Sequence, residues 1–143
     1  MQSVFGAAIA LDRVRLKRRR WFPLQPRRVV MAPWGHVHFH PASPWWCEDF
    51  AAAGIELQAL LIHEMVHVWQ AQTRGWWYLP LVRPFSRRYA YALIPGWTLA
   101  CYGIEQQAEI VRHVFLLRMG RRLAGAPPLS QYDGILPPEW LAG

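Results

Sequence analysis

The chain has few cysteines, few acidic residues and no long uninterrupted apolar run. Its two cysteines, Cys47 and Cys101, form no C-x-x-C motif, so we expect two free, buried thiols, with a single disulfide as the alternative. The apolar stretch 89–104 is interrupted by Pro95-Gly96 and is shorter than the roughly 18–20 residues that a membrane-spanning helix needs. No transmembrane helix is predicted.

The amino-terminal charges lie in the wrong order for a secretory signal. The apolar start, residues 1–11, precedes its basic residues, whereas a signal peptide places basic residues first. We therefore expect no signal peptide and a cytoplasmic location. With 143 residues, 53% of them hydrophobic, the chain is long enough for one domain, residues 1–143, with a core of its own.

Basic residues outnumber acidic ones and are concentrated near the start of the chain. There are 16 lysines and arginines against nine acidic residues, and eight of the 16 lie between Arg13 and Arg28. A solvated face that keeps the protein soluble is the preferred interpretation of this segment. Nine tryptophans accompany the charge, but no known nucleic-acid-binding motif is present, so nucleic acid is not favoured as a partner.

Periodicity indicates an α+β fold with two long helices. Apolar residues at helical spacing predict one helix over 55–74, which Gly75 is suited to end, and another over about 99–120. Shorter helices are expected over 3–11 and around 86–93. Short strands are expected at 14–16, 29–31 and 36–40. The last two strands should form a hairpin, which gives a small antiparallel sheet beside the helices.

The first long helix contains the motif His63-Glu64-Met65-Val66-His67, or H-E-x-x-H. Residues four apart share one helix face, so His63 and His67 can bind the same zinc ion. Glu64 would then project beside the metal, where it can accept a proton from zinc-bound water as a general base. The alternative is a pair of surface histidines on an ordinary helix.

A zinc site of this type needs a third protein ligand. The metzincin extension of the motif requires Gly at position 70 and His at position 73, but the chain has Gln70 and Thr73. The second long helix offers Glu105 and Glu109, four residues apart, of which one can bind zinc while the other hydrogen-bonds a zinc-binding imidazole. The alternative is that both acids face solvent and bind no metal. We favour Glu105 as the third ligand.

These motifs together resemble the gluzincin-type zinc peptidases. The matching residues are His63-Glu64-x-x-His67-Val68-x-Gln70 and Glu105-Gln106-Gln107-Ala108-Glu109. The chain is most similar to short zinc-peptidase-like domains associated with extracellular contractile injection systems. Taken over most of its length, the chain resembles the small bacterial proteins labelled "vgr-related". This resemblance adds two stretches to the motifs above, Arg27-Arg28-Val29-Val30-Met31-Ala32-Pro33 and Tyr102-Gly103-Ile104.

The resemblance implies roles for the two acids of the second helix. Glu105 would be the zinc ligand, and Glu109 would orient a zinc-binding histidine. Related gluzincins often have Asp at the position of Glu109, one methylene shorter, so an exchange of the two roles stays open. The expected architecture is a minimal zincin-like domain.

Further residues are candidates to assist at the site. Tyr102 and His113, together with Tyr89 and Tyr91, are candidates to stabilise an oxyanion opposite Glu64. Alternation over 36–40 puts three histidines on one strand face, which we interpret as a polar, solvent-facing side in preference to a second metal site. Residues 37–40 are expected at the sheet edge beside the zinc cleft, where they could pair with a peptide.

The leading interpretation is a zinc-dependent peptidase. His63, His67 and Glu105 would hold Zn²⁺, and Glu64 would assist attack of zinc-bound water on a peptide bond. The alternative is a non-catalytic zinc-binding accessory or scaffold protein of a secretion or injection apparatus. A basic protein that binds nucleic acid or a membrane surface is a third possibility. The expected partners are a peptide or protein substrate and components of an injection system.

Overall fold

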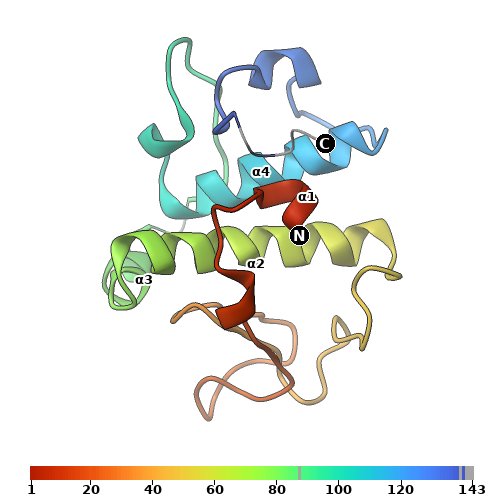
Figure 1. Cartoon of the computed structure of the whole chain (residues 1–143), viewed down its shortest axis with the longest axis vertical. Helices are drawn as coiled ribbons and strands as arrows, with labels where there is room; N and C mark the ends of the chain where they lie inside the picture. The colour runs from red at the N-terminus through yellow and green to blue at the C-terminus, as the bar shows by residue number, and fades with distance from the viewer. Residues whose placement is uncertain (87, 139, 141–143) are drawn as a thin grey trace.

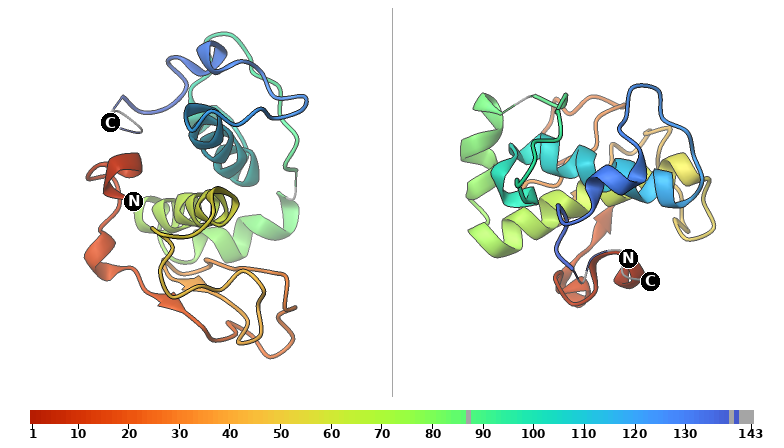
Figure 2. Two further views of the ribbon diagram at one scale, coloured as in Figure 1. Left: turned by 90° about the vertical axis from the view of Figure 1, so that its right-hand side faces the viewer. Right: turned by 90° about the horizontal axis from the view of Figure 1, so that it is seen from above.

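Two long helices that lie side by side form the centre of the fold (Figures 1 and 2). The computed structural model describes residues 1–86, 88–138 and 140. Helix α2 spans Ile55–Arg74 and helix α4 spans Ile104–Arg118. The helices run in opposite directions, because Gln70 near the end of α2 hydrogen-bonds the Ile104 carbonyl at the start of α4. Their facing sides supply much of the larger apolar core, and a smaller one lies at Ala71, Leu79 and Ile104.

The predicted extent of α2 is confirmed. Residues 61–68 are all buried, so tertiary packing holds the turns that carry His63, Glu64 and His67. The helix ends at Gly75, whose φ of 92° is one that residues with a side chain rarely adopt. The motif therefore lies in the rigid middle of the helix.

Helix α4 begins later than the sequence predicts. A separate 3₁₀ turn, η3, covers Leu99–Cys101, and Gly103 then caps α4. The Gly103 N–H donates to Gln106 Oε1 at 3.0 Å, which satisfies one of the free donors at the helix start. This start places Glu105 in the first turn of α4, where its carboxylate faces His63 and His67 in the middle of α2.

The prediction of an antiparallel sheet is wrong. Strands β1 (Leu16–Lys17) and β2 (Val37–His38) form a two-stranded parallel sheet. Met31 pairs antiparallel with His38, but only as an isolated bridge with hydrogen bonds of 3.1 and 2.7 Å. Pro33, which has no N–H, follows closely and cannot extend this pairing.

Strand β2 is an edge of this two-stranded sheet, but its outer side is occupied at His38, so the expected free backbone groups for pairing with a peptide are not present at that residue. On one side, the N–H groups of Val37 and Phe39 donate to carbonyls of residues 15 and 17. On the other side, His38 exchanges two backbone hydrogen bonds with Met31. The segment that contains Met31 is therefore the outer neighbour of β2.

The remaining elements are short. They are α1 (Gln2–Phe5), η1 (Leu11–Arg13), α3 (Tyr78–Val82), η2 (Arg83–Phe85) and η4 (Leu129–Tyr132). The helix expected over 3–11 is thus only the four residues of α1. The helix expected around 86–93 is absent from residue 86 and residues 88–93, and residue 87 lies outside the described residues.

The segment that follows α1 crosses α2 (Figure 1), and a side chain from near the other end of the chain also packs on this helix. The ring of Trp140 packs edge-to-face against Phe5 of α1 and against Trp69 of α2, each at 4.9 Å between centroids. Both cysteines are free as expected, but Cys101 is exposed and Cys47 only partly buried. Among the described residues, no helix is both long and apolar enough to span a bilayer.

Candidate metal centre

Two histidines of α2 and one carboxylate of α4 converge between the helices. Glu105 Oε2 lies 3.1 Å from His67 Nε2 and 3.4 Å from His63 Nε2. One ligand atom from each of the three residues lies within 4.8 Å of the others, and all three residues are buried. The two surface histidines of the alternative interpretation are therefore excluded by burial. The group could hold a metal ion.

Two of the three distances between these ligand atoms suit a tetrahedral ion. Two ligands of a tetrahedral zinc ion, each about 2.0–2.1 Å from the metal, lie about 3.3–3.4 Å apart. The contacts from Glu105 to the two imidazoles, 3.1 and 3.4 Å, are close to this value. Two imidazoles and one carboxylate, moreover, leave a fourth position for water or substrate.

A chain of amide groups fixes the orientation of the His67 ring. Gln107 Nε2 donates to the Tyr102 carbonyl at 2.7 Å, so Gln107 Oε1 is an acceptor. Gln70 Nε2 donates to that oxygen at 2.9 Å, which makes Gln70 Oε1 the acceptor for His67 Nδ1–H at 2.8 Å. The Nε2 atom of His67, which faces Glu105, is therefore the one available to a metal.

This arrangement favours a positive charge between His67 and Glu105. Without a proton on Nε2, the lone pair of His67 faces a carboxylate oxygen in a buried site, which is electrostatically unfavourable. Burial tends to lower the pKa of His67, but its hydrogen bond to Glu105 and the negative charges of Glu105 and Glu64 raise that pKa above its ordinary value. A metal ion would supply the same positive charge.

Glu64 lies beside this group of ligand residues. The side chain is buried, and its Oε2 atom has no partner among the described residues. Burial raises the pKa of this carboxyl group. Glu64 and His63 line a pocket of about 250 Å³, whose walls include Val30, Trp45 and Tyr89. A carboxyl group on the wall of such a pocket can receive a proton from a bound molecule.

Glu109 lies behind His63 and not at the ligand atoms. Its Oε1 is 3.6 Å from His63 Nδ1, on the opposite side of the ring from the nitrogen that faces Glu105. Arg112 donates to both Glu109 oxygens at 3.0 and 3.1 Å, and His113 Nε2 is 3.4 Å from one of them. Glu109 is thus placed to orient the His63 ring, and Glu105 is placed to bind the same metal ion as His63.

The structure does not bring Tyr102 or His113 to the pocket. The Tyr102 hydroxyl accepts the Ile94 N–H at 3.1 Å, and His113 Nδ1 is 2.6 Å from the Tyr91 hydroxyl. Of the four candidates for oxyanion stabilisation, Tyr89 lies at the pocket, where its ring stacks on His63 with 6.2 Å between centroids.

Sequence reasoning missed Arg83. This residue comes from η2, in the Pro-rich segment after α2, and its Nε lies 3.1 Å from Glu105 Oε1. Burial tends to raise the pKa of Glu105, but hydrogen bonds from the two histidines and the charge of Arg83 hold that pKa well below its usual range. Arg83 thus fixes one carboxylate oxygen and leaves the other to the histidines. No sequence motif marks it.

The histidines of the β2 region do not form a second site. His38 and His40 are each only 5% exposed, so the expectation of a solvent-facing strand side is wrong. Their rings contact the Arg19 carbonyl and the Arg20 guanidinium, respectively. Within the part of the chain that the structure describes, the only cluster of potential metal ligands is His63, His67 and Glu105.

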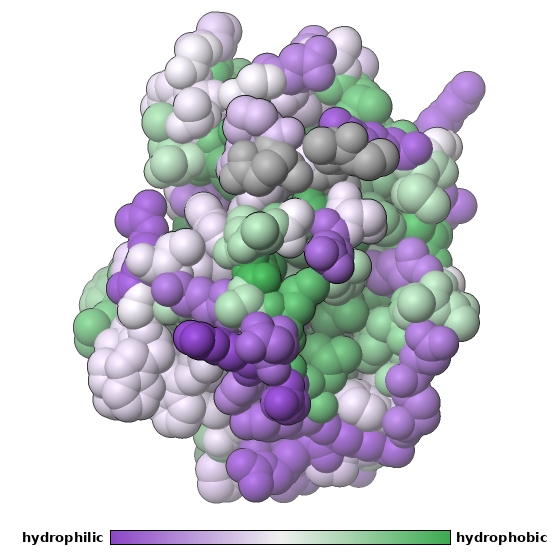
Figure 3. All heavy atoms as spheres, in the orientation of Figure 1, coloured by the Kyte–Doolittle hydropathy of each residue, from purple (hydrophilic) through white to green (hydrophobic). Residues whose placement is uncertain are grey.

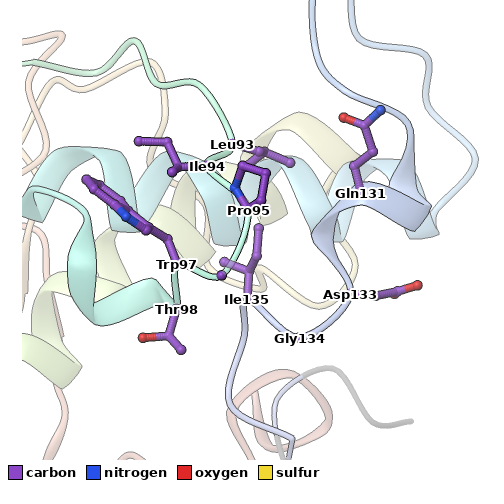
Figure 4. Close-up of a pocket in the computed structure, with 10 residues that line it drawn as sticks. Leu93, Ile94, Pro95, Trp97, Thr98, Gln131, Asp133, Gly134 and Ile135 are labelled. Carbon is purple, nitrogen blue, oxygen red and sulfur yellow. The ribbon is translucent and has the colours of Figure 1, made fainter.

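Another cavity lies apart from these residues (Figure 4). It has a volume of about 410 Å³ and lies between residues 93–98 and residues 131–135. Its walls are mostly apolar, and the carboxylate of Asp133 points away from its centre (Figure 4). None of the metal-site residues lines this cavity.

Comparison with known proteins identifies relatives of the whole fold. The chain is 38% identical to the type VI secretion system spike protein VgrG2b of Pseudomonas aeruginosa, in an alignment that covers 94% of this chain. It also matches the solved structure of the effector domain of P. aeruginosa VgrG2b, with a TM-score of 0.75 and 36% identity over 95% of this chain and 78% of that domain. The chain belongs to the VgrG2b effector-domain family. No protein-family model matches it.

The match to the complete spike protein is partial. The chain spans 14% of the length of VgrG2b, whereas it spans most of the separate effector domain. The relationship confirms the expectation of a vgr-related protein. The similarity is to the effector domain of VgrG2b. The rest of the spike protein has no counterpart in this chain.

Proposed function

We propose that this member of the effector-domain family is a zinc-dependent peptidase. The observation that carries the proposal is the buried convergence of His63, His67 and Glu105 beside the unpaired carboxylate of Glu64. Two imidazoles with one carboxylate are typical of catalytic zinc sites, whereas structural zinc sites are usually closed by four protein ligands. The pocket at His63 and Glu64 supplies the access that a reaction requires.

The residues around the proposed metal have separable roles. Bound zinc would polarise a substrate carbonyl and lower the pKa of water. Glu64 would accept a proton from the attacking water and pass it to the leaving amine. The Tyr89 hydroxyl, on the pocket wall, is the tyrosine best placed to stabilise an oxyanion. Arg83 would keep Glu105 in its ligand orientation.

A larger groove next to the pocket offers space for the substrate. The groove has a volume of about 630 Å³ and shares Val29, Arg83 and Tyr89 with the pocket. Its walls are mainly apolar and come from Trp21, Met31, Pro33, Leu79, Pro80 and Pro84. An apolar side chain of a peptide fits this lining. The segment around Met31, and not β2, is the extended backbone next to this groove.

The family relationship supports a role with an injection apparatus. VgrG2b is a spike protein of a type VI secretion system, and the matching structure is its effector domain. We propose that the present protein acts as such an effector, together with injection-system components. The non-catalytic accessory role is the outcome if zinc binds but no peptide is cleaved.

Metal analysis provides the first test. We expect purified protein to contain one zinc ion per chain, and its removal with a chelator to lower the melting temperature. A ligand at 100 times its Kd stabilises the folded state by about 2.7 kcal/mol, so added zinc should restore a shift of several degrees. His67→Ala should show no such response. Identical melting curves with and without zinc would contradict the proposal.

The amide chain behind His67 gives a second prediction. Gln70→Leu removes the acceptor for His67 Nδ1–H without a large change in volume. Loss of such an outer hydrogen-bond partner should weaken zinc binding by about 10–100-fold, as measured by competition with a chelating dye. Gln72→Leu, on an exposed part of the same helix, should retain wild-type affinity. Equal affinities in the two variants would show that Gln70 does not position His67.

A further inference from the structure

Acidic residues are missing from two long parts of the sequence. No Asp or Glu occurs between Asp12 and Glu48, or between Glu64 and Glu105. The first part contains the arginine-rich segment Arg13–Arg28, and the second contains four more arginines. Any surface that these two parts build together is therefore positively charged. The metal centre does not account for this distribution.

The two parts meet in a cluster of aromatic rings, of which three are exposed. Trp34, from the first part, lies 6.3 and 6.2 Å from Trp76 and Trp77 of the second, between ring centroids. Trp76 and Trp77 are themselves 5.1 Å apart. Trp21 packs edge-to-face on Trp34 at 5.3 Å, which joins the arginine-rich segment to the rings. We call these four residues the tryptophan cluster.

The cluster and its neighbours leave much apolar surface in contact with water. Trp76 and Trp77 are 59% and 53% exposed, and Trp34 is 40% exposed. Leu81 of α3 and Phe85 of η2, which follow in the chain, are 68% and 90% exposed. Single exposed apolar residues are common, but adjacent ones of this size mark an interaction surface.

Arginine side chains lie close to these rings in the sequence and in the structure. Arg19 and Arg20 directly precede Trp21 and are exposed, whereas Arg18 lies over the ring of Trp46 and 3.9 Å from a Glu48 oxygen. Arg74, at the end of α2, stacks on the ring of Tyr78 at 5.2 Å, just after the Trp76-Trp77 pair. In Figure 3, strongly hydrophilic side chains gather over the lower half of the visible face, where the segment before α2 runs. Exposed rings and arginines thus occupy the same end of the molecule.

We propose that this end of the molecule binds to the surface of an anionic lipid membrane. Tryptophan favours the boundary between lipid headgroups and acyl chains, because its ring is apolar and its N–H is polar. Leu81 and Phe85 would enter the apolar layer, and the arginines would contact lipid phosphates. A nucleic acid would use the arginines but would gain nothing from an exposed leucine. The binding is peripheral and does not require the metal centre.

Vesicle sedimentation tests the proposal. Full-length protein is mixed with vesicles of equal parts phosphatidylglycerol and phosphatidylethanolamine, or with vesicles of phosphatidylcholine alone. We expect at least about tenfold tighter binding to the anionic vesicles, weakened by added salt. The double variant Trp76→Ser/Trp77→Ser should lose most of this binding. Met119→Ser removes a residue that is 58% exposed at the opposite end of the helix pair, and it should bind like wild type.

Two further variants keep the result interpretable. Phe85→Ser changes a side chain that is 90% exposed, so it cannot disturb the core and should weaken vesicle binding by itself. Arg19→Gln/Arg27→Gln should weaken binding to anionic vesicles in particular. If only the arginine changes matter, charge alone explains the binding and the proposal fails. It also fails if wild-type protein binds neither kind of vesicle, or binds both equally.

Discussion

Glu105→Ala should abolish zinc binding under conditions in which the wild-type protein is saturated. Glu105 Oε2 contacts the Nε2 atoms of both histidines, and no other acid shares this position among the described residues. Its removal takes away the only anionic ligand and leaves Arg83 without its carboxylate partner. The remaining positive charge near the site would further disfavour a cation. Isothermal titration with zinc would measure the loss.

Glu109→Ala is the matched control for Glu105→Ala. The two acids are one helical turn apart, but Glu109 approaches only the outer nitrogen of His63, at 3.6 Å. Its loss should weaken zinc binding by about 10–100-fold, as the loss of an outer partner of a ligand does. The reverse order, with Glu109→Ala the more severe change, would show that the two acids exchange roles when metal binds.

The α2 part of the site could be predicted because its signal is local. The spacing of His63 and His67 fixes their common face once α2 forms, and Gly75 marks the end of that helix. Glu105 could be proposed because acids after the motif are few and the chemistry requires one. Of these acids, Glu105 and Glu109 lie four residues apart on the second predicted helix, and the packing of α2 on α4 decides between them.

The sheet, the role of Arg83 and the burial of His38 could not be predicted, because they depend on contacts between segments that are distant in the sequence. Strand β2 is two residues long and pairs with residues 16 and 17 on one side and with Met31 on the other, so no local pattern sets its direction or its pairing partners. Arg83 reaches Glu105 from a Pro-rich segment that carries no helical or strand periodicity. The burial of His38 arises from these same long-range contacts, which alternation along one strand cannot reveal.

The largest expected effect on catalysis comes from Glu64→Gln. The substitution preserves the size of a buried side chain and replaces the carboxylate oxygen that lacks a partner. Glutamine cannot accept the proton of an attacking water, so kcat should fall by about 10²–10⁴-fold, the usual contribution of a general base. Zinc content should stay at one ion per chain, because Glu64 is not among the three converging ligand residues.

Cleavage of an unfolded, fluorescently labelled polypeptide, followed over time, would measure this effect. Peptides with a large apolar residue are the first choice, since the groove beside the pocket is lined by tryptophan, leucine and proline side chains. Equal cleavage by wild type and Glu64→Gln would identify a contaminating protease. Zinc binding without cleavage in either form would instead support the accessory role, because the ligands would then hold a metal that no general base uses. A loss of cleavage with retained zinc separates proton transfer by Glu64 from metal binding by its neighbours.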